Sequence, residues 1–551
     1  MKPEYAERMQ NACRKEEPMN NSYDTLKLID ELVGIPSKTN TSAEVEVESL
    51  IYEKLKGIPK LLKDNTFGLE KIDRDPYNRS IVWGLLKGKG KKTIVLLSHH
   101  DVVDTIVYGN LQELAYEPKK LKEAMKTHNF SADVMQDLQS EDWMFGRGTA
   151  DMKGGLSVQL KLVEKYSKIK DFSGNLLLLT VPDEENMSLG MLSSVKLLND
   201  LSEKYQLDYK LVINSEPHER TNEKFKIYDS SVGKTMAVVY VQGKMAHIGS
   251  IFEGLNPLTI LSRIITHTEL NSSLSDKSLG ETSTPPSWSF GRDFKKNYDA
   301  SIPETAGGYL SFLTFNSSPK RILDSLKNIC IKSFEETVSH LQSEFKIIFP
   351  ENKEVPYYKP NIKLYEDLYR DAMVKDSEQT KMVLAQCFEE IKLQLNDRTI
   401  TIPDSNFIII ERLMKIVDYN KPTIVIALSP PYYPHVTSWS IESFTEIADM
   451  MRHSFPEDKV DIAHYFRGLS DLSYFGLQNE DEIVPYISSN MPLWKDDFYT
   501  IPFEGMKTIS IPTLIIGPWG KDLHQNTERV YIPDLVENVP AYIEKLFSNI
   551  F

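Results

Sequence analysis

Short strand-like runs alternate with helix-length segments along this chain, and that alternation constrains the fold more than any other feature. Four runs are rich in β-branched residues or leucine, as buried strands are: 79–86, 92–97, 176–181 and 209–214. Apolar residues at helical spacing mark 154–169 and 192–204, which lie after the second and third runs. This order predicts an α/β fold, in which a mixed, largely parallel sheet carries helices on both faces.

A second domain is expected because 551 residues exceed what one hydrophobic core usually supports. From about residue 230 the pattern becomes that of an α+β module, with strand-like runs at 235–243 and 309–315 and helical runs at 256–271 and 320–346. We therefore expect an inserted α+β domain at 230–360. The flanking parts, 1–229 and 361–551, would form one discontinuous domain.

Composition narrows the classes of function. The formal net charge of −15 argues against a nucleic-acid surface, which needs basic patches to release counterions. Three dispersed cysteines, Cys13, Cys330 and Cys387, indicate neither a disulfide framework nor a thiolate zinc site. The segment 1–21 is polar and has no signal-like apolar run, and the longest apolar runs are too short to span a bilayer. We expect a cytoplasmic protein with neither nucleic-acid nor membrane partners.

Five residues of metal-binding type are distributed over five separate segments: His99, Asp151, Glu185, Glu216 and His524. Four of them follow expected strands, and ligands in such sheets bind beyond the carboxyl ends of the strands. The fifth, Asp151, lies in the glycine-rich turn at 146–155, where glycines permit backbone angles that other residues resist. Two imidazoles and three carboxylates suit Zn²⁺ or a similar divalent ion, and one bridging carboxylate would make a two-metal site.

Each of these residues also has an ordinary interpretation. A histidine such as His99 is often only a solvated loop residue, and the adjacent Glu184 and Glu185 could be a solvated pair. At a sheet edge, however, one glutamate can ligate metal while its neighbour accepts a proton from activated water. Asp101, two residues after His99, could orient that imidazole. His100 and His218 adjoin the expected ligands and remain open as alternatives to them.

Taken together, these motifs resemble those of the M20 metallopeptidase superfamily. The matching stretches are His-x-Asp-Val-Val at 99–103, Gly-Arg-Gly-x-x-Asp-x-Lys-Gly-Gly at 146–155, Asp-Glu-Glu at 183–185, Glu-Pro at 216–217, and His524 with Glu528. The overall organisation looks most similar to the RocB-type branch, which is named for arginine utilisation. The resemblance implies a zinc-peptidase-like catalytic domain with an inserted lid or dimerisation domain.

The resemblance also implies a role for each matching residue. Asp151 would bridge two Zn²⁺ ions and precede a cis peptide bond to Met152, with Co²⁺ or Mn²⁺ as alternative metals. His99 and Glu216 would complete one ion, and Glu185 and His524 the other. Glu184 would be the general base and then the proton donor, and Asp101 would orient His99.

Three further residues are expected to bind substrate. The stretches 243–247 and 254–257 resemble a family signature in which His247 reaches the active site of a partner subunit and binds the oxyanion, with Asn256 nearby. Asp471 lies in a stretch similar to a small-residue substrate loop. The polar stretch 103–142 is expected to be irregular, and the segments 108–138 and 360–440 have no clear counterpart in smaller relatives.

These observations predict a two-zinc amidohydrolase or peptidase that cleaves an N-acyl amino acid or short peptide with metal-activated water and a glutamate base. Arginine catabolism and a homodimer formed through the inserted domain are implied by the resemblance. The alternative is a catalytically silent binding or regulatory protein of the same fold. A two-metal phosphoesterase would fit the ligand types, but the order of the motifs argues against it.

Overall fold

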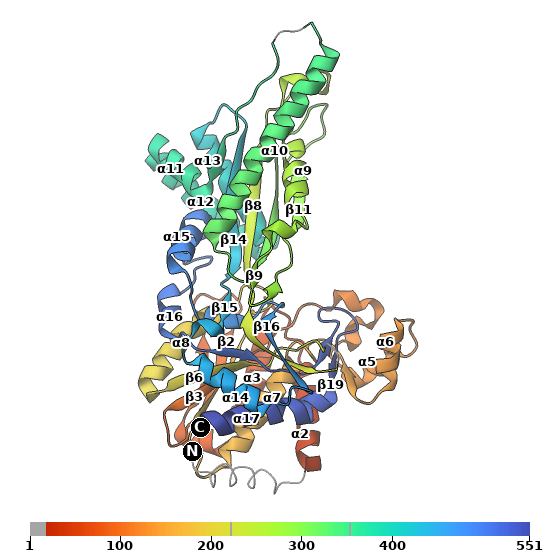
Figure 1. Ribbon diagram of the computed structural model, residues 1–551, viewed down its shortest axis with the longest axis vertical. Helices are drawn as coiled ribbons and strands as arrows, with labels where there is room; N and C mark the ends of the chain where they lie inside the picture. The colour runs from red at the N-terminus through yellow and green to blue at the C-terminus, as the bar shows by residue number, and fades with distance from the viewer. Residues whose placement is uncertain (1–17, 221–222, 352–353) are drawn as a thin grey trace. The chain divides into compact units, whose positions relative to one another are not determined.

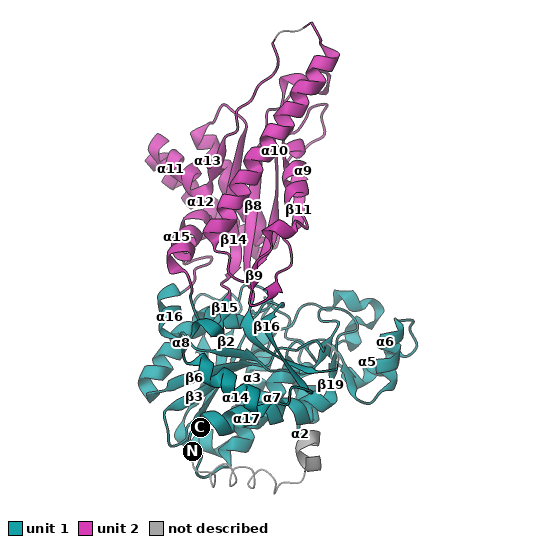
Figure 2. Ribbon diagram, viewed as in Figure 1, with its two compact units in different colours: residues 1–231, 436–477, 502–551 teal, residues 232–435, 478–501 magenta. Residues whose placement is uncertain are grey.

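The computed structural model describes residues 18–220, 223–351 and 354–551, and its helices and strands form two units (Figures 1 and 2). Unit 1 comprises Met1–Ser231, Val436–Leu477 and Pro502–Phe551, and unit 2 comprises Val232–His435 and Gln478–Ile501. Cys13 and most of the polar segment 1–21 lie outside the described residues. Among the residues that are described, no helix is both long and apolar enough to cross a membrane.

Unit 1 is built on a nine-stranded mixed sheet with the order β1-β2-β5-β3-β6-β17-β7-β15, in which β16 also pairs with β7. Its strands are β1 (Phe67–Lys71), β2 (Ser80–Leu86), β3 (Lys92–His99), β5 (Asn175–Val181), β6 (Asp208–Asn214), β7 (Phe225–Ser231), β15 (Val436–Thr437), β16 (Val460–Phe466) and β17 (Thr513–Ile515). The neighbouring strands β5, β3, β6 and β17 run parallel, so their carboxyl ends lie at one edge.

Helices cover both faces of this sheet. Alternate residues of the central strands, such as Ile94 and Leu96, join one large buried cluster. The helices that pack into that cluster include α2 (Pro18–Val33), α3 (Glu44–Lys56), α4 (Pro59–Asp64), α7 (Lys153–Ser167), α14 (Phe444–Ser454) and α17 (Val539–Ile550). Helix α8 (Leu189–Tyr205) packs against β2 and β5 outside it. The predicted α/β class, with a largely parallel centre and helices on both faces, is confirmed.

The segment that follows β3 is more ordered than its sequence suggested. An irregular stretch at 103–142 was expected, but the structure has η1 (Ile106–Leu114), α5 (Pro118–Met125) and α6 (Ala132–Gln139), followed by β4 (Trp143–Phe145). The helices share a small core of their own, to which Leu121, Met125, Val134 and Leu138 contribute. That expectation was wrong because α5 and α6 have only about two turns each, with a single buried apolar pair at i, i+4 spacing.

Unit 2 contains a five-stranded sheet with the order β11-β12-β8-β14-β13. Its strands are β8 (Gly233–Gln242), β11 (Ser287–Asp293), β12 (Thr305–Thr314), β13 (Ile362–Leu364) and β14 (Thr423–Tyr433). The helices α11 (Tyr365–Lys375), α12 (Ser377–Asn396) and α13 (Ile402–Val417) pack with Val238, Tyr240 and Val425 into one core. The helices α9 (Pro257–Thr268) and α10 (Pro319–Ile348) pack against each other and against the same sheet.

The exit from the inserted unit differs from the position expected near residue 360. Residues 361–435 remain in unit 2, and Gln478–Ile501 returns to it. The reason is that β14 pairs with β8 from Thr423↔Gln242 to Leu428↔Ala237, while α13 covers this pair. A buried apolar strand such as β14 suits either sheet, so its sequence does not indicate which one it joins.

Candidate functional site

Five side chains from separate segments of unit 1 meet at the carboxyl edge of its central strands. His99 ends β3, Glu185 follows β5 and Glu216 follows β6. Asp151 precedes α7, and His524 lies between β18 (Gly520–Lys521) and β19 (Arg529–Tyr531). The structure therefore brings together all five residues that the sequence suggested as metal ligands.

Asp151 occupies the centre of the cluster. Its Oδ1 lies 3.0 Å from Nε2 of His99, and its Oδ2 lies 3.2 Å from Nε2 of His524. Nε2 of His99 is also 3.6 Å from Oε1 of Glu216, whereas Nε2 of His524 is 3.1 Å from Oε1 of Glu185. The two oxygens of one carboxylate thus face two different imidazoles, each of which has a second carboxylate beside it.

The glycines around Asp151 serve two different purposes. Gly146 and Gly148 have φ values of 151° and 77°, which favour glycine. Gly155 lies in α7 and is needed for close packing, since a Cβ there would be 2.1 Å from the backbone oxygen of Ser215. The peptide bond from Asp151 to Met152 is cis, as the resemblance implied.

Glu528 and Arg147 connect the glycine turn to the loop that carries His524. Glu528 Oε1 accepts hydrogen bonds from the backbone N–H groups of Gly148, at 2.8 Å, and Ala150, at 3.3 Å. Arg147 forms a buried ion pair with Glu528, and its Nη2 donates to the backbone oxygen of His524 at 3.0 Å. The turn that carries Asp151 is therefore held to the segment that follows His524.

Asp101 supports the cluster mainly through backbone groups. Its carboxylate accepts from the N–H groups of Glu184 and Glu185, both at 3.1 Å. Nδ1 of His99 lies 3.1 Å from the backbone oxygen of Asp101 and 3.5 Å from its Oδ1. The ring of His99 is thus held more closely by the carbonyl than by the carboxylate, which instead fixes the turn with the two glutamates.

A buried ion-pair network behind this turn was not suggested by the sequence. Arg79 Nη1 donates to Glu44 Oε1 at 2.8 Å and to Asp183 Oδ1 at 2.7 Å. Glu44 Oε2 in turn accepts from the N–H of Asp183 at 2.9 Å. Asp183 begins the Asp-Glu-Glu motif, which was the one available signal, but no local pattern links it to partners so distant in the chain.

Two other histidines that adjoin the cluster have partners elsewhere. Nδ1 of His100 lies 3.1 Å from Oγ1 of Thr180, and Nδ1 of His218 lies 2.8 Å from the backbone oxygen of Gly517. Burial lowers the pKa of His218 to about 3, so that ring stays neutral inside the protein. One ring nitrogen of each of these alternative ligands thus has a partner outside the cluster.

The electrostatics of the cluster favour a bound cation. Burial raises the pKa values of Glu184 and Glu216, and nearby charges, including those of Glu185 and Asp471, raise both further against the opposing effect of His99. Burial likewise raises the pKa of Asp471 to about 7. A divalent cation would offset this crowding of carboxylates, and the imidazole and carboxylate donors fit Zn²⁺ or a similar ion.

The two histidines of the cluster differ in their exposure to solvent. The His99 side chain is 1% exposed, whereas that of His524 is 50% exposed. Hydrogen bonds to Asp151 and Glu185 raise the pKa of His524 to about 10. The cluster is therefore open to solvent on the His524 side.

Comparison with known proteins identifies the family. Residues 96–484, more than half of the chain, match the family described as Peptidase family M20/M25/M40. The chain belongs to this family. It is therefore a metal-dependent hydrolase of amide or peptide bonds.

Full-length relatives define the branch. The chain is 33% identical over 545 residues to the uncharacterized protein YqjN of Bacillus subtilis (95% of this chain, 96% of YqjN). It is 28% identical over 545 residues to Protein RocB of the same organism (96% and 95%), which places it in the RocB-type branch. The aminopeptidase PepT from Bacillus cereus shares the fold, with a TM-score of 0.53 and 12% identity over 96% of this chain and 98% of PepT.

Two expected substrate-binding residues of this M20-family chain belong to unit 2. His247 is exposed, and its Nδ1 accepts from the N–H of Gly249 at 3.1 Å. Asn256 caps α9, because its Oδ1 accepts from the N–H of Leu258 at 3.0 Å. Both side chains thus have local structural contacts in unit 2, and their functional roles remain predictions.

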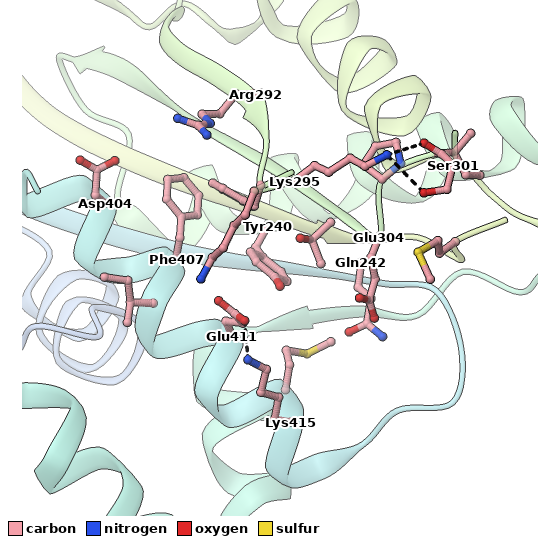
Figure 3. Close-up of a pocket in the computed structure, with 18 of the residues that line it drawn as sticks. Tyr240, Gln242, Arg292, Lys295, Ser301, Glu304, Asp404, Phe407, Glu411 and Lys415 are labelled. Carbon is pink, nitrogen blue, oxygen red and sulfur yellow. Dashed lines mark hydrogen bonds and ion pairs between the residues drawn. The ribbon is translucent and has the colours of Figure 1, made fainter. Parts of the chain in front are cut away.

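Unit 2 also has a cavity of its own, with a volume of about 800 Å³ (Figure 3). Tyr240 and Phe407 contribute aromatic surface to it, while Lys295 and Glu411 contribute charge. Both charged groups have partners, since Lys295 contacts Asp299 and Ser301 and Glu411 pairs with Lys415. This cavity is a feature of unit 2 alone and contains none of the five clustered residues.

Proposed function

We propose that this chain is a two-zinc amidohydrolase or peptidase that hydrolyses an amide bond of an N-acyl amino acid or a short peptide. The observation that carries the proposal is the position of Asp151, whose two carboxylate oxygens face the Nε2 atoms of His99 and His524. A carboxylate placed in this way suits a bridge between two ions. His99 with Glu216 would hold one ion, and His524 with Glu185 the other.

The donor set suits Zn²⁺, with Co²⁺ or Mn²⁺ as alternatives. Two such ions supply Lewis-acid activation of the scissile carbonyl and of the attacking water, and they stabilise the oxyanion. The chain must then provide a group that moves protons. In this proposal that group is the carboxylate of Glu184.

Glu184 would accept a proton from the attacking water as the new C–O bond forms. It would return that proton to the leaving nitrogen as the C–N bond breaks, which balances the hydrolysis. Burial raises the pKa of Glu184 in the metal-free chain, and bound cations would oppose this rise and keep its carboxylate ionised to accept the proton. Asp101 would assist by holding the N–H groups of Glu184 and Glu185 at 3.1 Å each.

Three further residues are proposed to bind the substrate. Asp471 would contribute to substrate binding, and the effect of its buried charge on the pKa values of Glu184 and Glu216 supports this proposal. His247 would bind the oxyanion across a homodimer, with Asn256 beside it. The resemblance to the RocB-type branch, which is named for arginine utilisation, would imply a substrate from arginine metabolism.

The role of Glu184 can be tested with three variants that differ only in the glutamate removed. Glu184→Gln should lower kcat by about 100- to 10,000-fold while metal content stays normal. Glu185→Gln should instead reduce metal content, and Glu203→Gln, at an exposed site on α8, should change neither. Full activity in Glu184→Gln would show that another group moves the proton.

The substrate can be sought among N-acyl amino acids and dipeptides. Acyl derivatives of arginine and ornithine should be hydrolysed with a higher kcat/KM than matched derivatives of leucine and alanine. If all derivatives are cleaved equally well, the proposed link to arginine metabolism is lost, although the hydrolase itself is not. If the metal-loaded protein cleaves none of them but still binds ligands, the silent binding protein is favoured.

The role of His247 requires two subunits, so it can be tested by complementation. His247→Ala and Glu184→Gln are each expected to be inactive alone. Mixed with subunit exchange, they should form hybrid dimers with one intact site and recover part of the activity. Absence of recovery, when exchange is demonstrated with labelled subunits, would rule out action across a dimer.

A further inference from the structure

The helical insertion after β3 packs against the hairpin that carries His524. This hairpin consists of β18 and β19, and β19 pairs with β4 at the end of the insertion, from Arg529↔Phe145 to Tyr531↔Trp143. Trp519 and Tyr531, on the hairpin side, pack against the core of the insertion. The insertion and the His524 loop therefore share one structural neighbourhood within unit 1.

Two basic residues at the ends of the His524 loop pair with two acidic residues of α6. Before the loop, Lys521 Nζ lies 3.0 Å from Asp133 Oδ1 and 2.8 Å from Asp137 Oδ2. After the loop, Arg529 Nε lies 2.6 Å from Asp137 Oδ2, and its Nη2 lies 2.6 Å from Asp133 Oδ2. Asp137 thus contacts both ends of the loop at once.

Contacts within the loop extend this support toward His524. Arg529 Nη1 donates to the backbone oxygen of Thr527 at 3.1 Å and pairs with Asp522. Thr527 Oγ1 also donates to Asp522 at 2.7 Å. His524 lies between these residues with a left-handed φ of 64° and a half-exposed side chain. Apart from its contacts with Asp151 and Glu185, this imidazole depends on the path of the backbone for its position.

The pairing with Asp137 is needed because Arg529 is fully buried. Its side chain is 0% exposed, while those of Asp137 and Asp133 are 9% and 62% exposed. Asp133 and Asp522 also pair with Arg529, so loss of the Asp137 charge would leave this buried guanidinium only partly compensated and would favour its movement toward water. Moving Arg529 would shift the start of β19 and with it the loop.

We infer that Asp137, assisted by Asp133, is a positioning residue that holds His524 opposite Asp151 and Glu185. The inference rests on the proposed role of His524 as a metal ligand. It also predicts a one-sided effect, because His99 and Glu216 are held by β3 and by the segment after β6, which α6 does not contact through these ion pairs. The insertion thus supports the His524 half of the cluster directly and reaches the other half only through Glu528 and the turn of Asp151.

The test is a titration of metal-free protein with Zn²⁺ against a chromophoric chelator, which resolves two binding steps. Asp137→Asn keeps the shape of the side chain and removes its charge. It should weaken one step by about 10- to 100-fold and leave the other within about twofold. Asp133→Asn, at the more exposed partner, should have the same one-sided effect with a smaller size. Glu123→Gln, at an exposed pair on α5 of the same insertion, is the matched control.

A second readout separates positioning from general loss of structure. In protein loaded with Co²⁺, Asp137→Asn should change the visible absorption of one of the two ions, and Asp137→Glu should restore it in part. Equal weakening of both steps, or no change in either, would overturn the inference. If the unmodified chain itself does not bind two ions, the proposed function fails first. If Asp137→Asn does not fold, Asp133→Asn and Asp137→Glu provide the same comparison.

Discussion

The close approach of α7 to the segment before Glu216 makes Gly155→Ala a sharp test of how the cluster is held. An added Cβ at Gly155 would lie 2.1 Å from the backbone oxygen of Ser215 and 2.7 Å from its Cβ. Ordinary contacts begin at 3.4 Å, so α7 and Ser215 would have to separate by about 1 Å. Because Asp151 precedes α7 and Glu216 follows Ser215, that movement would pull two proposed ligands apart.

The expected magnitude combines two opposing effects. Overpacking costs about 1–3 kcal/mol, while alanine in place of glycine in a helix contributes about 1 kcal/mol of stabilisation. The free energy of unfolding should therefore fall by about 0–2 kcal/mol, which leaves the protein folded. The affinity for metal should fall much more, by about 10- to 100-fold, because the distance between Asp151 and Glu216 changes.

The assay compares chemical unfolding of metal-free protein with Zn²⁺ titration for each variant. Gly476→Ala is the matched control, since the nearest atom to an added Cβ there is Cγ2 of Val436 at 4.0 Å. The control should bind metal like the unmodified chain. The reasoning is refuted if Gly155→Ala binds metal with unchanged affinity, since the close contact would then have no influence on the ligands.

Three other substitutions test separate parts of the structure. Glu528→Gln would leave the buried Arg147 without its charged partner. The free energy of unfolding, measured with urea, should fall by about 3–5 kcal/mol. A fall of less than about 1 kcal/mol would mean that this ion pair contributes little to stability. Burial lowers the pKa of His435 to about 4, below the ordinary value of about 6.5. The contribution of neutral His435 to the free energy of unfolding is therefore complete above pH ~6.5 and is lost as the pH falls toward 4. His435→Phe should therefore remove about 3 kcal/mol of the difference in unfolding free energy between pH 4 and pH 7, and an unchanged pH profile would contradict this assignment. Asp276→Ala would remove the acceptor for the N–H groups of Phe315, Asn316 and Ser317. The free energy of unfolding should fall by about 1–3 kcal/mol. An unchanged free energy of unfolding would mean that water replaces the carboxylate.

Much of the site could be predicted because its residues follow strands. Strand-like runs ending before His99, Glu185 and Glu216 indicated that these side chains would meet, since parallel strands bring their carboxyl ends to one edge. Asp151 could be predicted from its glycine turn. The packing role of Gly155 could not be predicted, because its contact with Ser215 depends on how α7 packs.

The supporting contacts could not be predicted from local patterns. Arg79, Glu44 and Asp183 come together from three distant segments, and nothing in their immediate sequence marks them as partners. Similarly, Asp137 and Arg529 are separated by most of the chain. Short helices, as in the insertion, and buried strands such as β14 give weak or ambiguous periodic signals. This explains why the helices of the insertion were not predicted and why the exit from unit 2 lies later than expected.

The central claim is that Asp151 joins two metal sites, and counting bound ions tests it most directly. Metal-free protein titrated with Zn²⁺ should bind two ions per chain, as measured by elemental analysis after removal of excess metal. His524→Ala should bind one, because His99 and Glu216 remain. Binding of a single ion by the unmodified chain, or of two by His524→Ala, would contradict the two-metal account.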